Sequence, residues 1–283
     1  MPATQALPTL TQARAPLTRE IEVMNERGER QTMQIPAERD LTVYVDKREL
    51  VTLMTLGADP EHLVLGYLLN QRLVKHLADI ESINVDWEVN SAAVRTHSGI
   101  DQIEERTAKK VVTTGCGQGS VFGGLMDEID QIKLPAARLC QQQLYGILEA
   151  IRQQESTYKS AGSVHGCALF HGTQMLMFVE DVGRHNAIDT LAGWMAMQGI
   201  HSKNAPDASQ PFVFYTTGRL TSEMVIKSAQ MGVAVVVSRS GITQMGYDIA
   251  QQLGLCTIGR AVNKHFVAYT ALDRLDMASQ AVG

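Results

Sequence analysis

The side chain best suited to take part in a reaction is the thiol of Cys116, which lies in a glycine-rich turn. The turn reads Thr113-Thr-Gly-Cys-Gly-Gln-Gly-Ser120 and follows an apolar run that favours a strand. Its three glycines tolerate positive φ and let the backbone approach a ligand closely. If Ser120 opens a helix, Cys116 would lie near the helix N-terminus, where the dipole and free N–H groups favour the reactive thiolate. The alternative is a cysteine buried in a tight turn, but three glycines favour the reactive interpretation.

The other three cysteines are interpreted as core residues. Cys140 falls in a predicted long helix, whereas Cys167 and Cys256 fall in predicted strands. No two cysteines have C-x-x-C spacing, so neither a zinc knuckle nor a thioredoxin-like dithiol is supported. The H-x-E and P-C-x-x-C signature of zinc deaminases is also missing. The sequence therefore predicts no metal site.

A second group of reactive side chains lies in Glu180-Asp-Val-Gly-Arg-His-Asn186, which closes a predicted strand and opens a helix containing Asp189. One Asp or Asn is enough to cap a helix, so the remaining polar groups call for another explanation. Carboxylates, a guanidinium, an imidazole and an amide together suit a polar ligand with donors and acceptors. Ligands also tend to bind at strand ends in open α/β sheets. The alternative is a salt-bridged cap and turn.

Two further strand-to-helix turns carry arginine and glycine. Tyr215-Thr-Thr-Gly-Arg-Leu-Thr-Ser-Glu223 and Ser238-Arg-Ser-Gly-Ile-Thr243 both offer helix N–H groups that can hold a phosphate, although neither is a Walker A motif. We expect Arg184, Arg219 and Arg239 to converge on one anionic ligand. The later segment Gly259–Phe266 adds three basic groups, Arg260, Lys264 and His265. The alternative is that this segment is only a polar hairpin turn.

The elements that must position these residues change character along the chain. The first half predicts a small α+β unit, in which Asp59 caps a helix that has Pro60 at its first position. Its expected strands are Leu41–Asp46, Glu49–Leu56, Ser82–Val85 and Ala92–Thr96, and its expected helix is Glu61–Val74. The second half alternates strands and helices, which predicts a layered, partly parallel sheet. Its expected strands are Val164–Phe170, Met175–Glu180, Phe212–Thr216, Ala234–Val237 and Cys256–Ile258, and its expected helices are Leu134–Gln153, Ala187–Gln198, Ser222–Met231 and Thr243–Leu253.

The pattern predicts an α/β protein in three parts. Residues 1–30 are expected to be a mostly unordered leader with one strand at Thr18–Met24. Residues 31–135 form the α+β domain that ends in the Cys116 loop, and residues 136–283 form the α/β domain.

Composition excludes several classes of protein. The 283 residues include 25 Lys+Arg and 30 Asp+Glu, so the formal net charge is −5, which argues against a general nucleic-acid or anionic-membrane binder. No stretch of about 18 apolar residues is present, and no signal-peptide h-region is found. Four cysteines in a chain of this length do not form a disulfide framework. These observations predict a cytoplasmic protein with reduced cysteines.

The motifs together resemble the FdhD family of formate dehydrogenase accessory proteins. The most specific match is Glu180-Asp-Val-Gly-Arg-His-Asn-Ala-Ile-Asp189, which is similar to the family signature E-D-V-G-R-H-N-A-x-D. Thr217–Met224 resembles the family segment S-G-R-x-S-S-E-x. Further corresponding elements are Ser238–Thr243, Leu253–Leu255 and Phe266–Tyr269, so that the resemblance extends from about residue 35 to residue 272.

The resemblance implies a sulfurtransferase. Such a sulfur carrier takes sulfur from a cysteine desulfurase as a persulfide and passes it to the molybdenum cofactor, bis(molybdopterin guanine dinucleotide), before insertion into formate dehydrogenase. Cys116 then holds the position of the persulfide cysteine. The stretch Arg260-Ala261-Val262-Asn263-Lys264-His265 corresponds to the cofactor-contacting segment, and Arg184, His185, Arg219 and Arg239 become candidate ligands of the cofactor's phosphates or guanine. The family further implies a homodimer and a C-terminal domain of the cytidine deaminase fold without its zinc site.

The sequence departs from the family in two places. Many members have C-x-x-C in the sulfur-carrying loop, where this chain has Gly119, and the usual aromatic and glycine residues of Arg260–His265 are largely replaced. One thiol is sufficient to accept and donate sulfur, so persulfide transfer survives the first change. The alternative function is a chaperone that binds the guanine-dinucleotide cofactor without moving sulfur. An independent hydrolase or deaminase function is disfavoured, because the sequence shows neither metal ligands nor a Ser–His–Asp pattern.

Overall fold

The computed structural model describes residues 7–100, 112–113, 129–200 and 210–277. The chain divides into two compact units. Unit 1 contains the residues up to Val121 together with Glu155–Gly166 and Val179–Met197, and unit 2 contains Phe122–Gln154, Cys167–Phe178 and Gln198–Gly283. The predicted division into residues 1–30, 31–135 and 136–283 stays a prediction.

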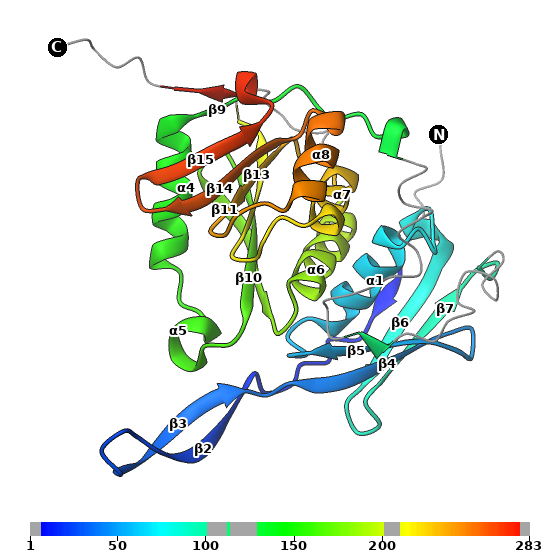
Figure 1. Cartoon of the computed structure of the whole chain (residues 1–283). Coiled ribbons are helices and arrows are strands. Elements are labelled where there is room, and N and C mark those ends of the chain that lie inside the picture. Colours follow the sequence, from blue (N-terminus) through cyan, green and yellow to red (C-terminus); the bar gives the residue numbers. More distant parts are fainter. Residues whose placement is uncertain (1–6, 101–111, 114–128, 201–209, 278–283) are drawn as a thin grey trace. The chain divides into compact units, whose positions relative to one another are not determined.

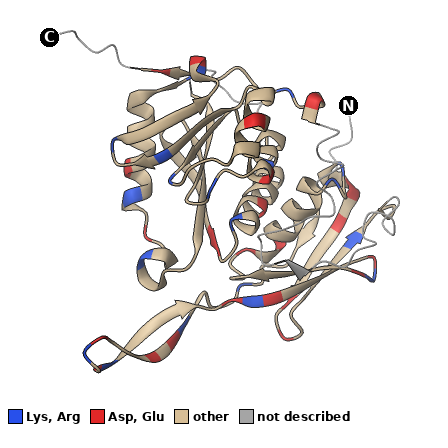
Figure 2. Ribbon diagram, viewed as in Figure 1, with Lys and Arg blue, Asp and Glu red and all other residues tan. Residues whose placement is uncertain are grey.

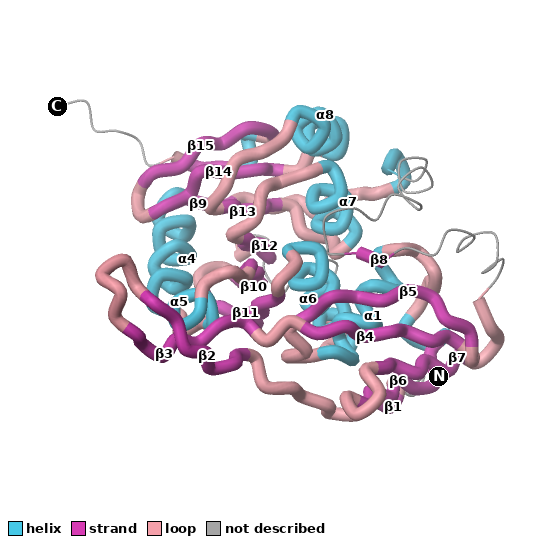
Figure 3. Tube along the Cα trace, turned by 60° about the horizontal axis from the view of Figure 1, so that its bottom comes forward, coloured by secondary structure: helices cyan, strands magenta, loops and turns pink. Residues whose placement is uncertain are grey.

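Unit 1 is built on a mixed six-stranded sheet in the order β1-β6-β7-β4-β5-β8 (Figure 3). The strands are β1 (Thr9–Leu10), β4 (Arg39–Val45), β5 (Arg48–Thr55), β6 (Ile80–Asp86), β7 (Ser91–Thr96) and β8 (Val112–Thr113). The β4–β5 and β6–β7 pairs are antiparallel hairpins, whereas β4 and β7 run parallel. The four longer strands confirm the strand predictions for this half of the chain.

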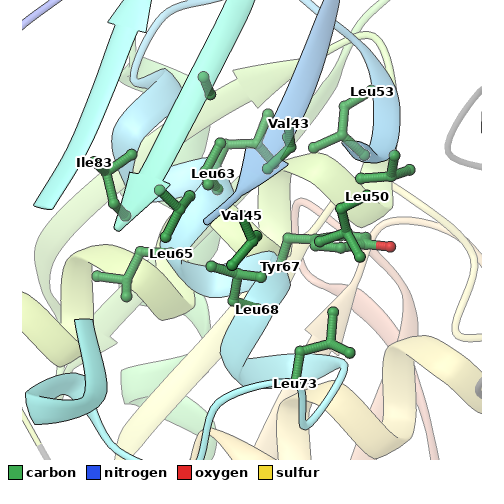
Figure 4. Close-up of a cluster of buried hydrophobic side chains, with 14 of the residues drawn as sticks. Val43, Val45, Leu50, Leu53, Leu63, Leu65, Tyr67, Leu68, Leu73 and Ile83 are labelled. Carbon is green, nitrogen blue, oxygen red and sulfur yellow. The ribbon is translucent and has the colours of Figure 1, made fainter. Parts of the chain in front are cut away.

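The core of unit 1 forms where α1 (Pro60–Asn70) covers one face of this sheet (Figure 4). Alternate residues of β4 point inward, so that Leu41, Val43 and Val45 are buried. They pack with Leu63, Leu68 and neighbouring residues of α1. The helix begins as predicted, with Asp59 as N-cap and Pro60 in the first turn.

The helices α1 and α6 (Arg184–Met197) contact each other through glycine. A Cβ atom on Gly66 would lie 1.7 Å from the carbonyl oxygen of Asp189, and a Cβ on Gly193 would lie 2.0 Å from that of His62. Only residues without a side chain permit so close an approach of two helix backbones. Because sheet and helix cover opposite sides of α1, it is buried nearly all round, and its sequence shows no polar face.

The strand predicted at Thr18–Met24 is confirmed with the same bounds, whereas the expectation of a mostly unordered leader around it is wrong, because β1 and the start of β3 (Arg30–Pro36) also lie within residues 7–30. Strands β2 (Thr18–Met24) and β3 form an antiparallel hairpin with acidic and basic residues along it (Figure 2). Alternation places Ile21 and Met33 on one face of this ribbon and Glu22 and Arg30 on the other. The polar composition of this segment predicted disorder. In the structure, pairing between the two strands supplies hydrogen-bond partners for their backbone N–H and C=O groups.

Unit 2 is organised around the sheet β11-β10-β12-β13-β14-β15 (Figure 1). Its strands are β10 (His165–His171), β11 (Gln174–Asp181), β12 (Phe212–Thr216), β13 (Val235–Ser238), β14 (Cys256–Val262) and β15 (His265–Thr270). Strands β12, β13 and β14 are parallel, and β10 and β15 are antiparallel to their neighbours. The chain passes between the two units within β10 and β11.

Helices lie on both faces of this sheet, α4 (Gln141–Gln153) on one and α7 (Ser222–Gln230) and α8 (Gln244–Leu253) on the other (Figure 1). The apolar stripe Leu144, Ile147 and Leu148 of α4 packs on the sheet. The prediction that this helix begins at Leu134 is wrong. Residues 132–138 are irregular and Leu139–Cys140 form β9, which pairs with β16 (Leu275–Asp276). This pairing at a distant site overrides the Pro135 start signal.

The structure confirms a mixed α/β protein, while the cytidine-deaminase-like architecture of the second domain stays a prediction. The remaining short helical elements are η1 (Leu77–Asp79), η2 (Ile129–Gln131), α5 (Thr157–Ala161) and η4 (Leu272–Arg274). Within the part of the chain that the structure describes, no helix is long and apolar enough to cross a membrane.

Candidate functional site

The predicted site residues divide between the two units. Arg184 and His185 belong to unit 1, whereas Arg219, Arg239 and the segment 260–265 belong to unit 2. Cys116 lies outside the described residues. The convergence of Arg184 with the two other arginines therefore stays a prediction.

Asp181 is the centre of the polar junction in unit 1, between the end of β11 and the start of α6. Its Oδ2 accepts hydrogen bonds from Thr55 Oγ1 at 2.5 Å and from the backbone N–H of Leu56 at 3.2 Å. Its Oδ1 accepts from the Gly183 N–H at 3.1 Å and from Asn186 Nδ2 at 2.9 Å. Asp181 thus ties the end of β5 to the turn that opens α6.

This carboxyl group is almost fully buried. Burial raises the pKa of Asp181 to about 6, and its four hydrogen bonds act in the opposite direction. All its strong acceptor sites are directed at protein donors, so the group is suited to holding the junction rather than to exchanging protons with a ligand.

The other carboxylates and amides of the motif are also engaged within unit 1. Glu180 accepts hydrogen bonds from the first two N–H groups of α5, Thr157 at 2.5 Å and Tyr158 at 3.1 Å. Asn186 Nδ2 also donates to the Met54 carbonyl oxygen at 2.6 Å. These partners are 22 or more residues away in sequence. They favour the capping interpretation for this part of the motif.

Asp189 and the two basic residues complete the junction. Asp189 is fully buried and accepts a hydrogen bond from Asn70 Nδ2 at 2.7 Å, which joins α6 to the end of α1. Arg184 and His185 occupy the first turn of α6 and are both buried. Their role as cofactor ligands stays a prediction.

In unit 2, the parallel strands β12 and β13 end side by side, with Thr216 paired to Ser238. Each strand is followed by one of the predicted arginine turns. The first turn is held by Thr216 Oγ1, which accepts hydrogen bonds from the Gly218 N–H at 3.1 Å and from Cys167 Sγ at 3.4 Å. Parallel strands of one sheet present their carboxyl ends at the same edge, so the sequence pattern placed these turns correctly.

Serine hydroxyl groups link the two turns to each other. Ser238 Oγ donates to the Gly218 carbonyl oxygen at 2.7 Å, and Ser240 Oγ donates to that of Thr217 at 2.9 Å. The Arg239 N–H donates to the Thr216 carbonyl oxygen at 3.0 Å, and Leu220 N–H to that of Gly241 at 3.0 Å. The two turns therefore form one hydrogen-bonded unit.

The arginines of these turns are exposed at the same edge. Arg219 and Arg239 are both exposed, as is Arg260, whose backbone N–H donates to the Ser240 carbonyl oxygen at 2.7 Å. Burial raises the pKa of Tyr215 to about 12, and the nearby charge of Arg239 acts against that rise. Three cationic side chains on one hydrogen-bonded backbone can attract an anion, particularly a phosphate.

The segment 260–265 contains the end of β14, the turn formed by residues 263–264 and the first residue of β15. Arg260 and Asn263 have positive φ, and Val262 pairs with His265, so the segment is a bulge followed by a tight hairpin. Most of its side chains are exposed, but that of Ala261 lies in the unit 2 core. The hairpin interpretation of the sequence is confirmed, and contact with a cofactor stays a prediction.

Three hydroxyl residues that shape this edge were not predicted to do so from the sequence. Thr216, Ser238 and Ser240 hold the turns through their hydroxyl groups. Their signal is a hydroxyl residue at a strand end, one or two positions before glycine or arginine, a pattern that favours side-chain-to-backbone bonding. Within the described ranges, no cluster of three or more His, Cys, Asp or Glu is arranged to hold a metal ion.

Comparison with known proteins relates the chain to one family. The model described as the FdhD/NarQ family matches residues 36–276. A protein named sulfur carrier protein FdhD from Halalkalibacterium halodurans is 28% identical over 245 residues, covering 86% of this chain and 88% of its own. A protein of the same name from Bacillus subtilis is 28% identical over 242 residues, covering 83% of this chain and 87% of its own.

A solved structure has the same fold. It belongs to a Desulfotalea psychrophila protein assigned as a formate dehydrogenase accessory protein, and it superposes with a TM-score of 0.71 at 22% identity. The match covers 92% of this chain and all of the other. At this identity the likeness concerns the fold alone.

Proposed function

The chain belongs to the FdhD/NarQ family, and on that premise we propose that it carries sulfur for the maturation of formate dehydrogenase. The observation that carries the proposal is the match over residues 36–276, which includes Cys116 and all the arginine turns. Relatives that align over most of their length are named sulfur carrier proteins. We further propose that the chain acts as a sulfurtransferase with a persulfide on Cys116, in the cytoplasm and as a homodimer.

The proposed first step is a sulfur transfer from a cysteine desulfurase. The Cys116 thiolate attacks the terminal sulfur of the desulfurase persulfide, a new S–S bond forms on Cys116, and the desulfurase cysteine leaves as a thiolate. Atoms and electrons balance without an oxidant. Cys167 and Cys256 are unsuited to this role because both are fully buried, and burial raises the pKa of Cys256 to about 12.

The proposed recipient is the molybdenum cofactor, bis(molybdopterin guanine dinucleotide), bound as substrate before its insertion into formate dehydrogenase. The exposed arginines at the ends of β12 and β13 support a polyanionic ligand, because they concentrate positive charge on a chain whose net charge is −5. Arg219, Arg239 and the segment 260–265 are the proposed ligands of its phosphates or guanine, and Arg184 and His185 are proposed as further ligands.

The test is persulfide formation on the full-length protein. After incubation with a cysteine desulfurase and cysteine, mass spectrometry should find one added sulfur atom, mapped to Cys116. The Cys116→Ala variant should gain none and should fail to restore formate dehydrogenase activity in cells that lack this protein. Cys256→Ala is the matched control, since it removes a buried thiol, and it should behave like the unchanged protein.

A cofactor chaperone is the competing function, favoured by Gly119 at the position of the second cysteine. It predicts that Cys116→Ala still supports maturation and still binds guanosine diphosphate. That outcome would reject sulfur transfer while leaving cofactor binding in place. Loss of maturation with retained nucleotide binding supports the carrier.

A further inference from the structure

Unit 2 contains a cavity that the proposed function does not use. It has a volume of about 740 Å³, within the range of small-molecule sites. Its wall is made by the segment before α4, the first turn of α4 and the C-terminal η4–β16 segment. The lining residues are Ala136, Ala137, Arg138, Cys140, Gln143, Asp273, Arg274 and Asp276.

Cys140 lines this cavity, so the prediction that it is a core residue within a helix is wrong. Cys140 is the N-cap of α4 and is half-buried, whereas the two other described cysteines are fully buried. Its Sγ accepts a hydrogen bond from the Gln143 N–H at 3.4 Å, and Gln143 Oε1 accepts one from the Cys140 N–H at 2.9 Å. The thiol is thereby fixed at the wall of the cavity.

The cavity wall carries both signs of charge next to this thiol. The β9–β16 pairing places Asp276 opposite Cys140. Asp276 forms an ion pair with Arg138 at 2.9 Å, in which both side chains are at least half exposed. Such an exposed pair contributes little, so either partner can turn to a charged ligand at small cost. Arg274 donates to the Pro135 carbonyl oxygen at 2.8 Å and supplies a second cation.

We propose that this cavity binds small zwitterionic disulfides and that Cys140 undergoes thiol–disulfide exchange with them. A disulfide carrying carboxylate and ammonium groups matches the two arginines and two aspartates of the wall. The Cys140 thiolate attacks one sulfur of the bound disulfide, a mixed disulfide forms, the original S–S bond breaks, and the other half leaves as a thiolate. The bound disulfide is the only oxidant required.

This modification is independent of the proposed sulfur carriage, since it involves neither Cys116 nor the arginine turns. The test uses oxidised glutathione as the zwitterionic probe and 2-hydroxyethyl disulfide as an uncharged one, with the full chain. Peptide mapping follows the rate of labelling at Cys140. We expect a glutathionyl group on Cys140 and none on Cys167 or Cys256, and Cys140→Ser removes that label while serine still caps α4.

The charged wall is tested with Arg138→Gln. We expect this change to lower the ratio of the two labelling rates, glutathione over hydroxyethyl, by up to about fivefold, the factor that one exposed ion pair supplies. Arg152→Gln is the matched control, because Arg152 is a similarly exposed arginine near the other end of α4, and it should leave the ratio unchanged. No label on Cys140, or a ratio equal in all three proteins, overturns the proposal; an equal ratio would mean an exposed thiol without a binding site.

Discussion

Replacing Gly66 with alanine tests the helix contact at the centre of unit 1. The new Cβ would lie 1.7 Å from the Asp189 carbonyl oxygen, about 1.6 Å closer than an ordinary C···O contact of about 3.3 Å. The obstacle is the backbone of α6, so no change of rotamer relieves it. The two helices must separate or tilt.

Three contributions determine how much Gly66→Ala should lower the free energy of unfolding. Overpacking in a filled core costs about 1–3 kcal/mol. Separation also loosens the buried bond from Asn70 to Asp189, and an unsatisfied buried group costs about 1–3 kcal/mol more. The better helix propensity of alanine offsets up to about 1 kcal/mol of this. The free energy of unfolding should therefore fall by about 3 kcal/mol, a large share of the typical stability of a domain.

Urea unfolding followed by circular dichroism measures this loss. Gly146→Ala is the matched control, since it makes the same substitution in α4. Its Cβ would meet the methyl group of Thr173, an exposed residue that can move, at 2.9 Å. The control should change stability by less than about 1 kcal/mol. If Gly66→Ala is equally mild, the backbone contact between α1 and α6 is not as described.

Two further changes test the polar networks. The pKa of Asp181 is about 6 in the folded protein, whereas its ordinary value is 3.8. Between these two pH values the folded state binds more protons than the unfolded state. The free energy of unfolding therefore falls, by up to about 3 kcal/mol, as the pH rises through this window. Asp181→Asn should be less stable and should lose this pH dependence in urea titrations; an unaltered pH profile would contradict the assignment. Ser238→Ala removes the partner of Gly218 O and Ser240 N, so we expect a loss of about 1–3 kcal/mol and weaker binding of guanosine diphosphate by calorimetry. The exposed Ser160→Ala serves as its control, and similar results for both serines would count against a linked pair of turns.

Local patterns predicted most of the elements and the place of the arginine turns. The strand Phe212–Thr216 agrees in full with β12, and α7 and α8 agree within one residue at each end. These segments succeed because their hydrophobic periodicity and caps are encoded in neighbouring residues. Strand β2 was predicted with its bounds, but its hairpin partner β3 and the late start of α4 were missed. The start of α4 depends on the pairing of β9 with β16, a distant segment that local sequence does not show.

The sequence by itself determined the α/β class, the family motifs and the arrangement of the turns after β12 and β13. Only the tertiary structure decided what the polar motif after β11 does. Asp181 bonds to Thr55 and Leu56, more than 120 residues earlier in the chain. Spacing along a sequence reports which side chains share a face, but it does not report which distant donor a buried carboxylate meets. The same reason explains the error for Cys140. The helical sequence pattern predicted a buried core residue, whereas the pairing of β9 with β16 places Cys140 at the wall of a cavity.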